Sequence, residues 1–441
     1  MKKSLAIFIR YFFRSSMVLL LSSPFFILLA TLQTRPTLSE NRPLTQTEVS
    51  IVENLILSIA PESLSESSLE DASLNIPDVN LLIRHSLRLT GQSNKWNARI
   101  SADKQRIDSI LDWKPFPEWI PLYITIKGGF LHEENQLRLD RLVIGKLKIP
   151  TSWTAQFISI IEPNARKLFS SLEPIEQILK TVTLQSVDAS NVQIQLRWEP
   201  ELISELSDQA QRLLISPEDQ ERIAEHYLAI NNLVTTIPTD TRAISISRLL
   251  SATFEAAYDN SMSGANPLAE NRTLFQTLAV YVNNEDISKL LGKEAAAELP
   301  QARFIEVRLL RRQDLAQHVA SIAAITASLG PELAVLLSTT KETYDARYRS
   351  GFSFSDLTAN SVGVTLATLA MESETSAIEM QRRLSALESE SDFMPEVGNN
   401  RDGISESAFN SMYADSGSTE YLEKLNEIRE AIEAKPIFQN F

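Results

Sequence analysis

Cysteine is absent from the 441-residue chain, glycine occurs only 12 times, and there are four histidines. Without cysteine the chain has no disulfide, no thiolate nucleophile and no cysteine-ligated metal. The glycine content lies well below the usual ~7%, which disfavours glycine-rich phosphate loops, propellers and folds with many β-turns. The four histidines are scattered and leave little material for a histidine-rich metal site.

An excess of positive charge is also missing. The formal net charge is −14, which disfavours nucleic acid as a partner. The chain lacks the Gly-x-Gly-x-x-Gly, P-loop, His-Glu-x-x-His and Gly-x-Ser-x-Gly motifs, so their familiar chemistries have no support. A hydrophobic content of 43% with 22% charged residues is typical of a folded chain, and the length predicts two or three domains of ~150 residues.

The N-terminal segment has the pattern of a membrane anchor. Four cations, Lys2, Lys3, Arg10 and Arg14, precede the uncharged stretch 15–34. Twenty helical residues span ~30 Å, the thickness of the hydrocarbon core of a bilayer. The positive charges before the stretch predict a cytoplasmic N-terminus and a body on the far side of the membrane.

Two interpretations of this segment compete. A cleaved signal peptide requires a short apolar region and a small-x-small cleavage site, whereas residues 30–34 contain no good Ala-x-Ala match. The length of the apolar run favours an uncleaved signal anchor. We therefore predict a single-pass protein of the inner membrane of a Gram-negative bacterium, with its C-terminal body in the periplasm and its membrane contact through residues 15–34.

Alternating apolar and polar residues predict long antiparallel strands within residues 76–200. The alternation is clear from Trp96 to Ala102 and again from Leu122 to Ile126. Its phase shifts between Leu139 and Leu142, at Gly145 and between Leu184 and Val187, which is typical of β-bulges. Between these strands, residues 151–180 have helical spacing and are predicted to cover the concave face of the sheet.

The C-terminal half reads as helical. Ser216-Pro217-Glu218-Asp219 is typical of a helix start, and residues 236–242 and 261–267 are predicted loops. The apolar stretch 315–337, interrupted by Gly330-Pro331, is predicted to be a buried helical hairpin rather than a second membrane span. Residues 372–441 hold fifteen acidic and six basic residues, so this region contributes −9 to the net charge.

These patterns predict an α+β protein with an N-terminal transmembrane anchor, a curved antiparallel sheet with covering helices, and a mainly helical C-terminal domain. The tether is predicted to contain one short helix over 46–59, and the acidic tail is predicted to end in a helix over 419–434. The predicted boundaries are 1–34 for the signal anchor, 35–75 for the tether, 76–200 for the sheet domain, 201–390 for the helical domain and 391–441 for the acidic tail.

The main candidate site lies between residues 311 and 363. His318, Glu342, Asp345 and Asp356 can converge if three predicted helices pack together, because Glu342 and Asp345 share one helix face. One imidazole and two or three carboxylates suit general acid–base catalysis or a hard metal ion. We assign these four as catalytic candidates and assign no resident metal or cofactor. The binding candidates beside them are Lys341, Ser353 and Asn360.

A purely structural role for the same residues is the alternative. Ser353-x-x-Asp356 is close to a helix capping box, and Asn360 can bond the backbone. Gly363 can simply allow two helices to approach, and His318 on an alanine-rich helix is typical of a core histidine.

The string Lys-Glu-x-x-Asp followed by Gly-Phe-Ser-x-x-Asp-Leu-x-x-Asn-x-x-Gly, within residues 312–363, resembles a pattern in VanZ-like proteins and small periplasmic lipoproteins. The resemblance implies an acidic residue, a loop with Ser and Asp, and Asn and Gly on the helix that follows. More broadly, the chain resembles large uncharacterised proteobacterial envelope proteins with an N-terminal anchor.

The sheet region offers a second candidate. Its segments 128–139 and 144–150 resemble the AsmA-like or tubular lipid-binding domains of the envelope, which implies that the curved sheet holds an acyl chain. The alternative is that the apolar faces only pack on each other, since every half-buried sheet needs a cover.

Three functions follow. The first is a non-catalytic envelope protein that binds lipid, cell wall or a protein partner. The second is a hydrolase-type enzyme that uses the His318/Glu342/Asp345/Asp356 cluster. The third is an assembly scaffold whose acidic tail recruits a basic partner.

Overall fold

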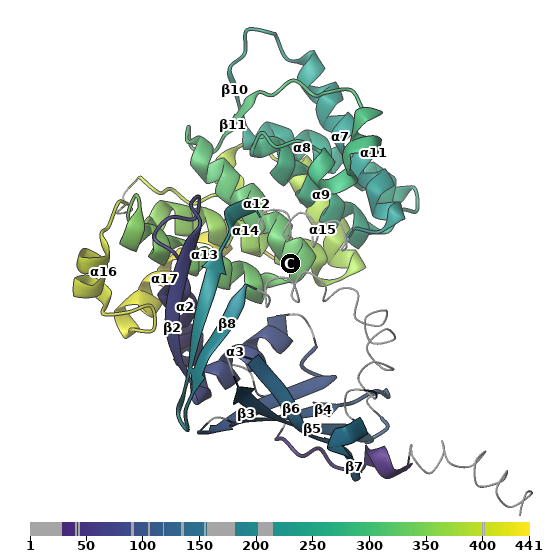
Figure 1. Cartoon of the computed structure of the whole chain (residues 1–441). Helices are drawn as coiled ribbons and strands as arrows, with labels where there is room; N and C mark the ends of the chain where they lie inside the picture. The colour runs from purple at the N-terminus through teal and green to yellow at the C-terminus, as the bar shows by residue number, and fades with distance from the viewer. Residues whose placement is uncertain are drawn as a thin grey trace, which may run out of the picture. The chain divides into compact units, whose positions relative to one another are not determined.

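The computed structural model describes residues 29–39, 42, 45–89, 92–104, 106–117, 119–133, 136–153, 156, 181–201, 215–398, 400 and 402–441. Within these residues the fold is α+β, with antiparallel sheets and a helical C-terminal part, as predicted (Figure 1). Residues 15–28 of the predicted anchor and nearly all of the predicted helical stretch 151–180 lie outside the described residues.

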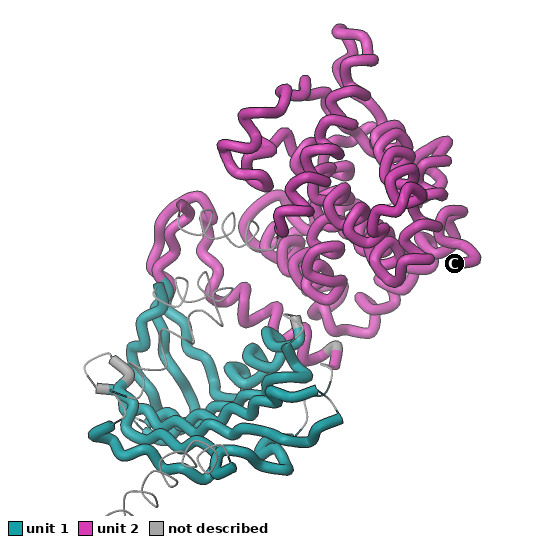
Figure 2. Tube along the Cα trace, turned by 90° about the vertical axis from the view of Figure 1, so that its right-hand side faces the viewer, with its two compact units in different colours: residues 1–44, 71–173, 180–196 teal, residues 45–70, 174–179, 197–441 magenta. Residues whose placement is uncertain are grey.

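The described residues form two compact units, coloured separately in Figure 2. The sheet unit comprises residues 1–44, 71–173 and 180–196, and the helical unit comprises 45–70, 174–179 and 197–441. Among the described helices, none combines the length and apolar character needed to cross a membrane. Leu32 and Gln33, at the end of the predicted anchor, form a short strand.

The main sheet of the sheet unit is antiparallel, with the order β3-β4-β5-β6-β7 and with β1 paired to the start of β5. A second sheet has the order β2-β9-β8. The strands are β1 (Leu32–Gln33), β2 (Ser68–Asn75), β3 (Trp96–Asp103), β4 (Arg106–Trp113), β5 (Tyr123–Glu133), β6 (Gln136–Ile144), β7 (Leu147–Ile149), β8 (Val182–Val187) and β9 (Asn191–Trp198).

Two of the three phase shifts are bulges. Gly129 lies opposite Arg141 and Phe130 opposite Leu139, so Asp140 is the extra residue in β6. Gln185 is the corresponding extra residue in β8. The prediction at Gly145 is wrong, because this residue forms the turn between β6 and β7 with φ of 58°, a conformation that glycine adopts without strain.

Residues 76–89 depart from the predicted strand pattern and form helix α3 (Ile76–Leu89). Asn75 accepts a hydrogen bond from the backbone of Asp78 at 2.8 Å, which caps the first turn. Asn80 fixes α3 to β3, because its amide both donates to and accepts from the backbone of Ile100. Leu81 and His85, four residues apart, are buried on one face.

The helical unit is built from long helices joined by short loops. The unit also contains two short parallel strands, β10 (Ala243–Ser245) and β11 (Glu306–Arg308), which were not predicted from the sequence. The helices are α2 (Gln46–Ile59), α7 (Pro217–Thr236), α8 (Ile246–Met262), α9 (Pro267–Val282), α10 (Ser288–Leu291), α11 (Lys293–Ala297), α12 (Gln313–Leu329), α13 (Pro331–Tyr348), α14 (Phe354–Glu372), α15 (Glu374–Ser385), α16 (Glu406–Tyr413) and α17 (Thr419–Glu433).

Several predicted signals are confirmed here. Ser216 caps α7 by accepting a hydrogen bond from the backbone of Asp219 at 3.1 Å, with Pro217 in the first turn. The predicted hairpin is α12 and α13, which meet at Gly330, where φ is 91°. Helix α17 ends within one residue of its predicted limit.

The predicted tether and tail are not separate from this unit. Helix α2 has the predicted bounds, but its Val52 and Leu57 are buried and its Glu53 accepts a hydrogen bond from Thr339 on α13. Residues 391–441 contribute Phe409 and Tyr421 to the main core. Burial of these apolar side chains stabilises the fold, so neither segment behaves as an appendage.

Helices α12 and α14 approach each other closely at Gly363. A Cβ at this position would lie 2.6 Å from the backbone oxygen of Val319 on α12. Backbone atoms cannot move aside as a flexible side chain can, so only glycine fits this contact. This close approach is the role expected for Gly363 from the sequence.

We therefore expect Gly363→Ala to destabilise the protein by about 1–3 kcal/mol, because the added methyl group forces the two helices apart. Gly398→Ala is the matched control, since a Cβ at Gly398 meets no atom within 4 Å. Chemical denaturation of both variants measures the difference. Equal stability of the two would show that the helices are not in tight contact.

A second polar group in this unit is buried around His226 on α7. Its Nε2 lies 3.5 Å from Glu270 on α9, and Arg222 lies 3.3 Å from the other oxygen of Glu270. Burial lowers the pKa of His226 to about 4, and the charge of Arg222 adds to this effect, whereas Glu270 opposes it. His226 is therefore neutral in the folded protein near neutral pH.

This burial predicts a loss of stability in acid. In the unfolded chain His226 takes up its proton near pH 6.5, but in the folded chain only near pH 4. The unfolded state thus binds more protons between these values, and stability falls by about 3 kcal/mol as the pH drops across this window. Urea unfolding from pH 7 to pH 4 measures the slope. His226→Gln, which cannot titrate, should flatten it, and an unchanged slope would contradict the assignment.

Candidate functional site

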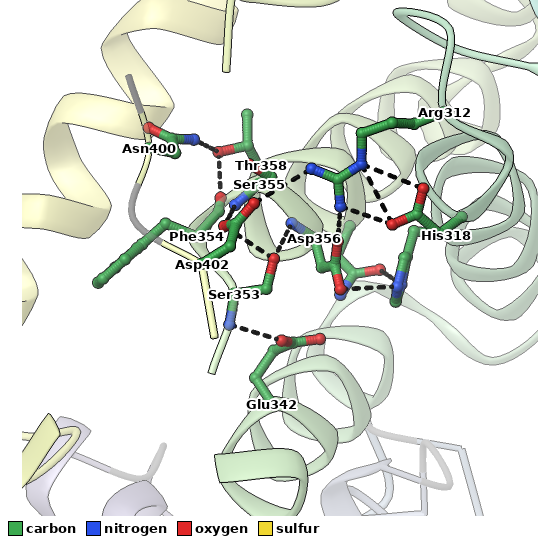
Figure 3. Close-up of polar contacts among 12 residues, drawn as sticks. Arg312, His318, Glu342, Ser353, Phe354, Ser355, Asp356, Thr358, Asn400 and Asp402 are labelled. Atoms are coloured by element: carbon green, nitrogen blue, oxygen red, sulfur yellow. Dashed lines mark hydrogen bonds and ion pairs between the residues drawn. The ribbon is translucent and has the colours of Figure 1, made fainter. Parts of the chain in front are cut away.

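Three helices of the helical unit bring the predicted site residues together (Figure 3). Helix α12 supplies His318, α13 supplies Glu342, and the first turns of α14 supply Asp356 and Asn360. The chain can turn from α13 into α14 because Gly351 has φ of 92° and sits against the backbone of Gly403. We call the group His318, Glu342, Asp356, Asn360 and Arg312 the His318 cluster.

The ring of His318 is held on both sides by α14. Its Nδ1 lies 3.0 Å from Oδ1 of Asn360, and its Nε2 lies 3.3 Å from Oδ2 of Asp356. The side chains of His318 and Asp356 are only 14% and 17% exposed. Asp356 and Asn360 are four residues apart, so one face of α14 presents both to the imidazole.

Arg312, at the start of α12, joins the cluster to its surroundings. Its guanidinium contacts Asp314 at 2.5 Å and both Asp356 and Asp402 at 3.1 Å. The hydrogen bond to Asp314 is the main cause that raises the pKa of Arg312, and the other two carboxylates add to it. Arg312 is therefore a permanent positive charge at the edge of the cluster.

Asp402 is a member of this network that the sequence analysis missed. It accepts hydrogen bonds from Oγ of Ser353 at 2.9 Å and from the backbone of Ser355 at 3.0 Å. Burial opposes the ionisation of Asp402, but the bonds from Ser355, Ser353 and Arg312 outweigh it and lower its pKa. The sequence predicts a tail over residues 391–441, and within it only the Asp402-Gly403 pair, a common turn signal, indicates a fixed position.

Ser353 has the structural role proposed for it as the alternative. Its hydroxyl accepts a hydrogen bond from the backbone of Asp356 at 3.1 Å and so caps α14, while it donates to Asp402. Its own backbone N–H donates to Oε2 of Glu342 at 3.2 Å. Through these three hydrogen bonds Ser353 connects the first turn of α14 to Glu342 and Asp402.

Glu342 is fully buried, and this burial raises its pKa. Lys341 lies 3.3 Å from Glu342 and 2.8 Å from Asp345. Asp345 is thus engaged by Lys341 and stands apart from the group formed by His318, Glu342 and Asp356, whose candidate ligand atoms all lie within 4.8 Å of one another. The structure brings together three of the four predicted catalytic residues.

This arrangement can hold a proton or a cation, but it is nearly closed. The groups that could react are buried or almost so, and the more exposed side chains around them are the charged ends of Arg312 and Lys341. A substrate larger than a few atoms would have to displace these ion pairs. The geometry therefore suits an ion or water better than a large organic substrate.

The sheet unit contains a second candidate site, a cavity of about 330 Å³ that we call the Trp96 pocket. Trp96 stacks on its cross-strand partner Trp113, with ring centroids 5.2 Å apart, which fixes the orientation of its indole. The backbone of Lys114 donates to that of Lys95 at 2.8 Å, so these two lysines are neighbours. The lining residues are Pro36, Leu38, Ser93, Asn94, Lys95, Trp96, Asn97, Asp112, Lys114 and Tyr123.

Asp112 at the base of this pocket is already satisfied. It accepts hydrogen bonds from Thr125 at 2.5 Å and from the backbone of Leu38 at 2.7 Å. Its negative charge is thus used to fix the segment after β1 onto the sheet. Lys95 and Lys114 are the two cationic residues among those that line the pocket.

Comparison with known proteins gives no match, whether with family models, with curated proteins or with solved structures. The resemblances to VanZ-like proteins and to envelope lipid-binding domains therefore stay predictions.

The network makes a prediction for Asp402. Asp402→Ala removes the acceptor for Ser355 and Ser353 and leaves Arg312 with one partner fewer, so we expect a loss of about 1–3 kcal/mol in unfolding free energy. Asp240→Ala, on an exposed loop, is the control and should change stability by less than about 0.5 kcal/mol. Thermal unfolding followed by circular dichroism measures both. A stable Asp402→Ala variant would indicate that the hydrogen bonds to Asp402 contribute little to the stability of the cluster.

Proposed function

We propose that the chain is a single-pass protein of the inner membrane, with a periplasmic body, whose sheet unit binds the headgroup of an anionic phospholipid in the Trp96 pocket. The observation that carries this proposal is the pocket itself, where two lysines lie beside Trp96 and Tyr123. The lysines suit a phosphate group, and the aromatic and aliphatic lining suits the glycerol and the first acyl carbons.

The volume of the pocket favours a lipid headgroup over larger ligands of the cell envelope. About 330 Å³ falls at the lower end of the range for small-molecule sites. This space holds a headgroup but not two acyl chains, which would stay in the bilayer. The proposal is therefore recognition at a membrane surface rather than extraction and transport of a whole lipid.

The loop that borders the pocket supports a membrane surface as the partner. Residues 114–122 connect β4 to β5, and Lys114 and Tyr123 at its two ends both line the pocket. On this loop Trp119 is 80% exposed, and Phe116 is also exposed. Exposed aromatic residues beside lysines are typical of segments that enter the interface of a bilayer.

The N-terminal segment points the same way. Pro36 and Leu38 line the pocket and directly follow the predicted anchor, residues 15–34. Leu32 and Gln33 pair with β5, so the last residues of the predicted anchor belong to the sheet unit, and the pocket at Leu38 lies only a few residues beyond them. A membrane-anchored chain would therefore keep this pocket close to lipid headgroups.

The other two predicted functions have less support. The His318 cluster is too closed for a hydrolase with a large substrate. Glu342 is fully buried, and Asp356 is paired with the guanidinium of Arg312. The acidic region 391–441 has four of its aromatic side chains, Phe393, Phe409, Tyr421 and Phe438, in the core, which leaves little free segment for recruiting a basic partner.

Native mass spectrometry of the full chain in detergent tests the proposal with added phosphatidylglycerol and phosphatidylcholine. We expect one tightly bound phosphatidylglycerol and weaker binding of phosphatidylcholine. Each lysine near an anionic headgroup contributes about 1 kcal/mol, so the double variant Lys95→Glu/Lys114→Glu should weaken binding at least ~30-fold.

The matched control is Lys146→Glu/Lys148→Glu, which reverses two exposed charges on and beside β7 without touching the pocket. This control separates recognition by the pocket from general attraction to negative charge. Equal loss in both double variants, or no bound phosphatidylglycerol in the wild type, would refute the proposal. Binding of a cell-wall glycan in its place would assign the pocket to a different ligand.

A further inference from the structure

We propose that His318, Glu342 and Asp356 bind a divalent transition-metal ion, Zn²⁺ or Mn²⁺, in the helical unit. This site is independent of the Trp96 pocket, which is built by residues of the sheet unit alone. One imidazole and two carboxylates form a mixed nitrogen and oxygen set that suits these ions.

The spacing of the ligand atoms fits a metal ion with small adjustments. Nε2 of His318 and Oδ2 of Asp356 are 3.3 Å apart. An ion about 2.1 Å from each would subtend an angle of roughly 105°, close to the tetrahedral value. All three ligand atoms lie within 4.8 Å of one another, so a rotation of the Glu342 carboxylate completes the set.

Each candidate ligand is also held by a second group of the protein. Nδ1 of His318 is bonded to Asn360, Oδ1 of Asp356 to Arg312, and Oε2 of Glu342 to the backbone of Ser353. Metal ligands in proteins usually have such outer partners, which fix the ring or carboxylate and leave one atom free for the ion. In this cluster the orienting contacts exist on all three residues, and a bound ion would replace Nζ of Lys341, which lies 3.3 Å from the other oxygen of Glu342.

The contact between His318 and Asp356 calls for a positive charge. With the amide oxygen of Asn360 as acceptor, Nδ1 of His318 carries the proton and donates it. In neutral His318 the lone pair of Nε2 then faces a carboxylate oxygen at 3.3 Å, and two acceptors repel each other. A proton on Nε2 or a metal ion between the two atoms turns this repulsion into attraction.

Asn360 gives a separate indication of a bound group. The residue is 1% exposed, and within the described chain its Nδ2 has no hydrogen-bond partner. A buried amide donor without an acceptor is unfavourable. A hydroxide on the metal ion, formed from bound water whose pKa the ion lowers, would supply an acceptor beside the ring of His318.

The charge balance of the neighbourhood is negative. Five carboxylates and two cations belong to the ion-pair network that includes the ring, which leaves a formal excess of three negative charges when His318 is neutral. Glu342 and Asp356 hold two of these negative charges away from solvent, where they are costly, and a divalent ion reduces the excess to one. The carboxylates are Asp314, Glu342, Asp345, Asp356 and Asp402, and the cations are Arg312 and Lys341.

The imidazole selects the class of ion. Ca²⁺ and Mg²⁺ prefer oxygen ligands, and Ca²⁺ takes six to eight of them. The cluster offers one nitrogen and two carboxylates in a confined space, which favours Zn²⁺ or Mn²⁺.

Equilibrium dialysis tests the site on the full chain in detergent. The protein is stripped with EDTA and dialysed against ZnCl₂ or MnCl₂, and bound metal is measured by elemental analysis. We expect one ion per chain in the wild type, no displacement by a large excess of Mg²⁺ or Ca²⁺, and at least about tenfold weaker binding in His318→Gln and Asp356→Asn.

Two control variants alter similar residues away from the cluster. His226→Gln removes another buried histidine of the same unit, and Asp240→Asn removes an exposed carboxylate. Both should keep the full stoichiometry. Binding that is unchanged in His318→Gln and Asp356→Asn, or that is equally weakened in the controls, would overturn the site, as would a wild type that takes up no metal.

A spectroscopic measurement on the wild type covers the case in which the ligand variants fail to fold. Pulsed electron paramagnetic resonance of the Mn²⁺-loaded chain detects the nitrogen of a directly coordinated imidazole. Nitrogen coupling in a one-to-one complex supports the site. A Mn²⁺ signal with oxygen ligands only would overturn it.

Discussion

The close approach of α12 and α14 at Gly363 is the contact on which the polar centre of the helical unit depends. The absent side chain of Gly363 lets α14 lie directly against the backbone of Val319, one residue after His318. At this separation the imidazole reaches both Asp356 and Asn360 on the facing helix. A wider separation would leave three polar side chains buried without their partners, which is costly in a low-dielectric interior.

The charges around this contact are arranged in layers. The inner layer is the imidazole and two carboxylates, and the outer layer is Arg312, Lys341 and the groups that cap α14. The outer groups come from segments far apart in sequence, including Asp402 from the last fifty residues. The segment after residue 390 is therefore part of the polar centre, and one of its acidic residues, Asp402, has a structural role there.

In the sheet unit the candidate site is a pocket beside stacked aromatic side chains, not a buried cluster of charges. Its pocket is formed where β3, β4 and β5 begin or end, and a pair of stacked tryptophans keeps one indole in place beside two lysines. The segment that follows the predicted anchor is fastened here by Asp112. If a bilayer holds the N-terminus, the unit that meets the lipid and the unit that holds the charged cluster perform separate tasks.

Local patterns in the sequence determined much of the secondary structure. The bounds of α2, the cap of α7, the break at Gly330 and the bulge at Asp140 are all decided by neighbouring residues, so periodicity and turn chemistry were sufficient to predict them. Helix α3 was missed because its short amphipathic pattern was read as alternation, although Asn75 and Asp78 supplied a cap. The helices that carry His318, Glu342 and Asp356 were recognisable from the sequence, but their convergence was predicted only on the condition that these helices pack together.

Only the tertiary structure decided which polar residues belong to the centre and which do not. Asp345 shares a helix face with Glu342, yet Lys341 binds it, and the distant Asp402 enters the network through a turn. The burial of α2 and of the C-terminal segment also depends on apolar surfaces contributed by other helices. These outcomes are set by contacts between residues far apart in the chain, and spacing along one segment carries no information about them.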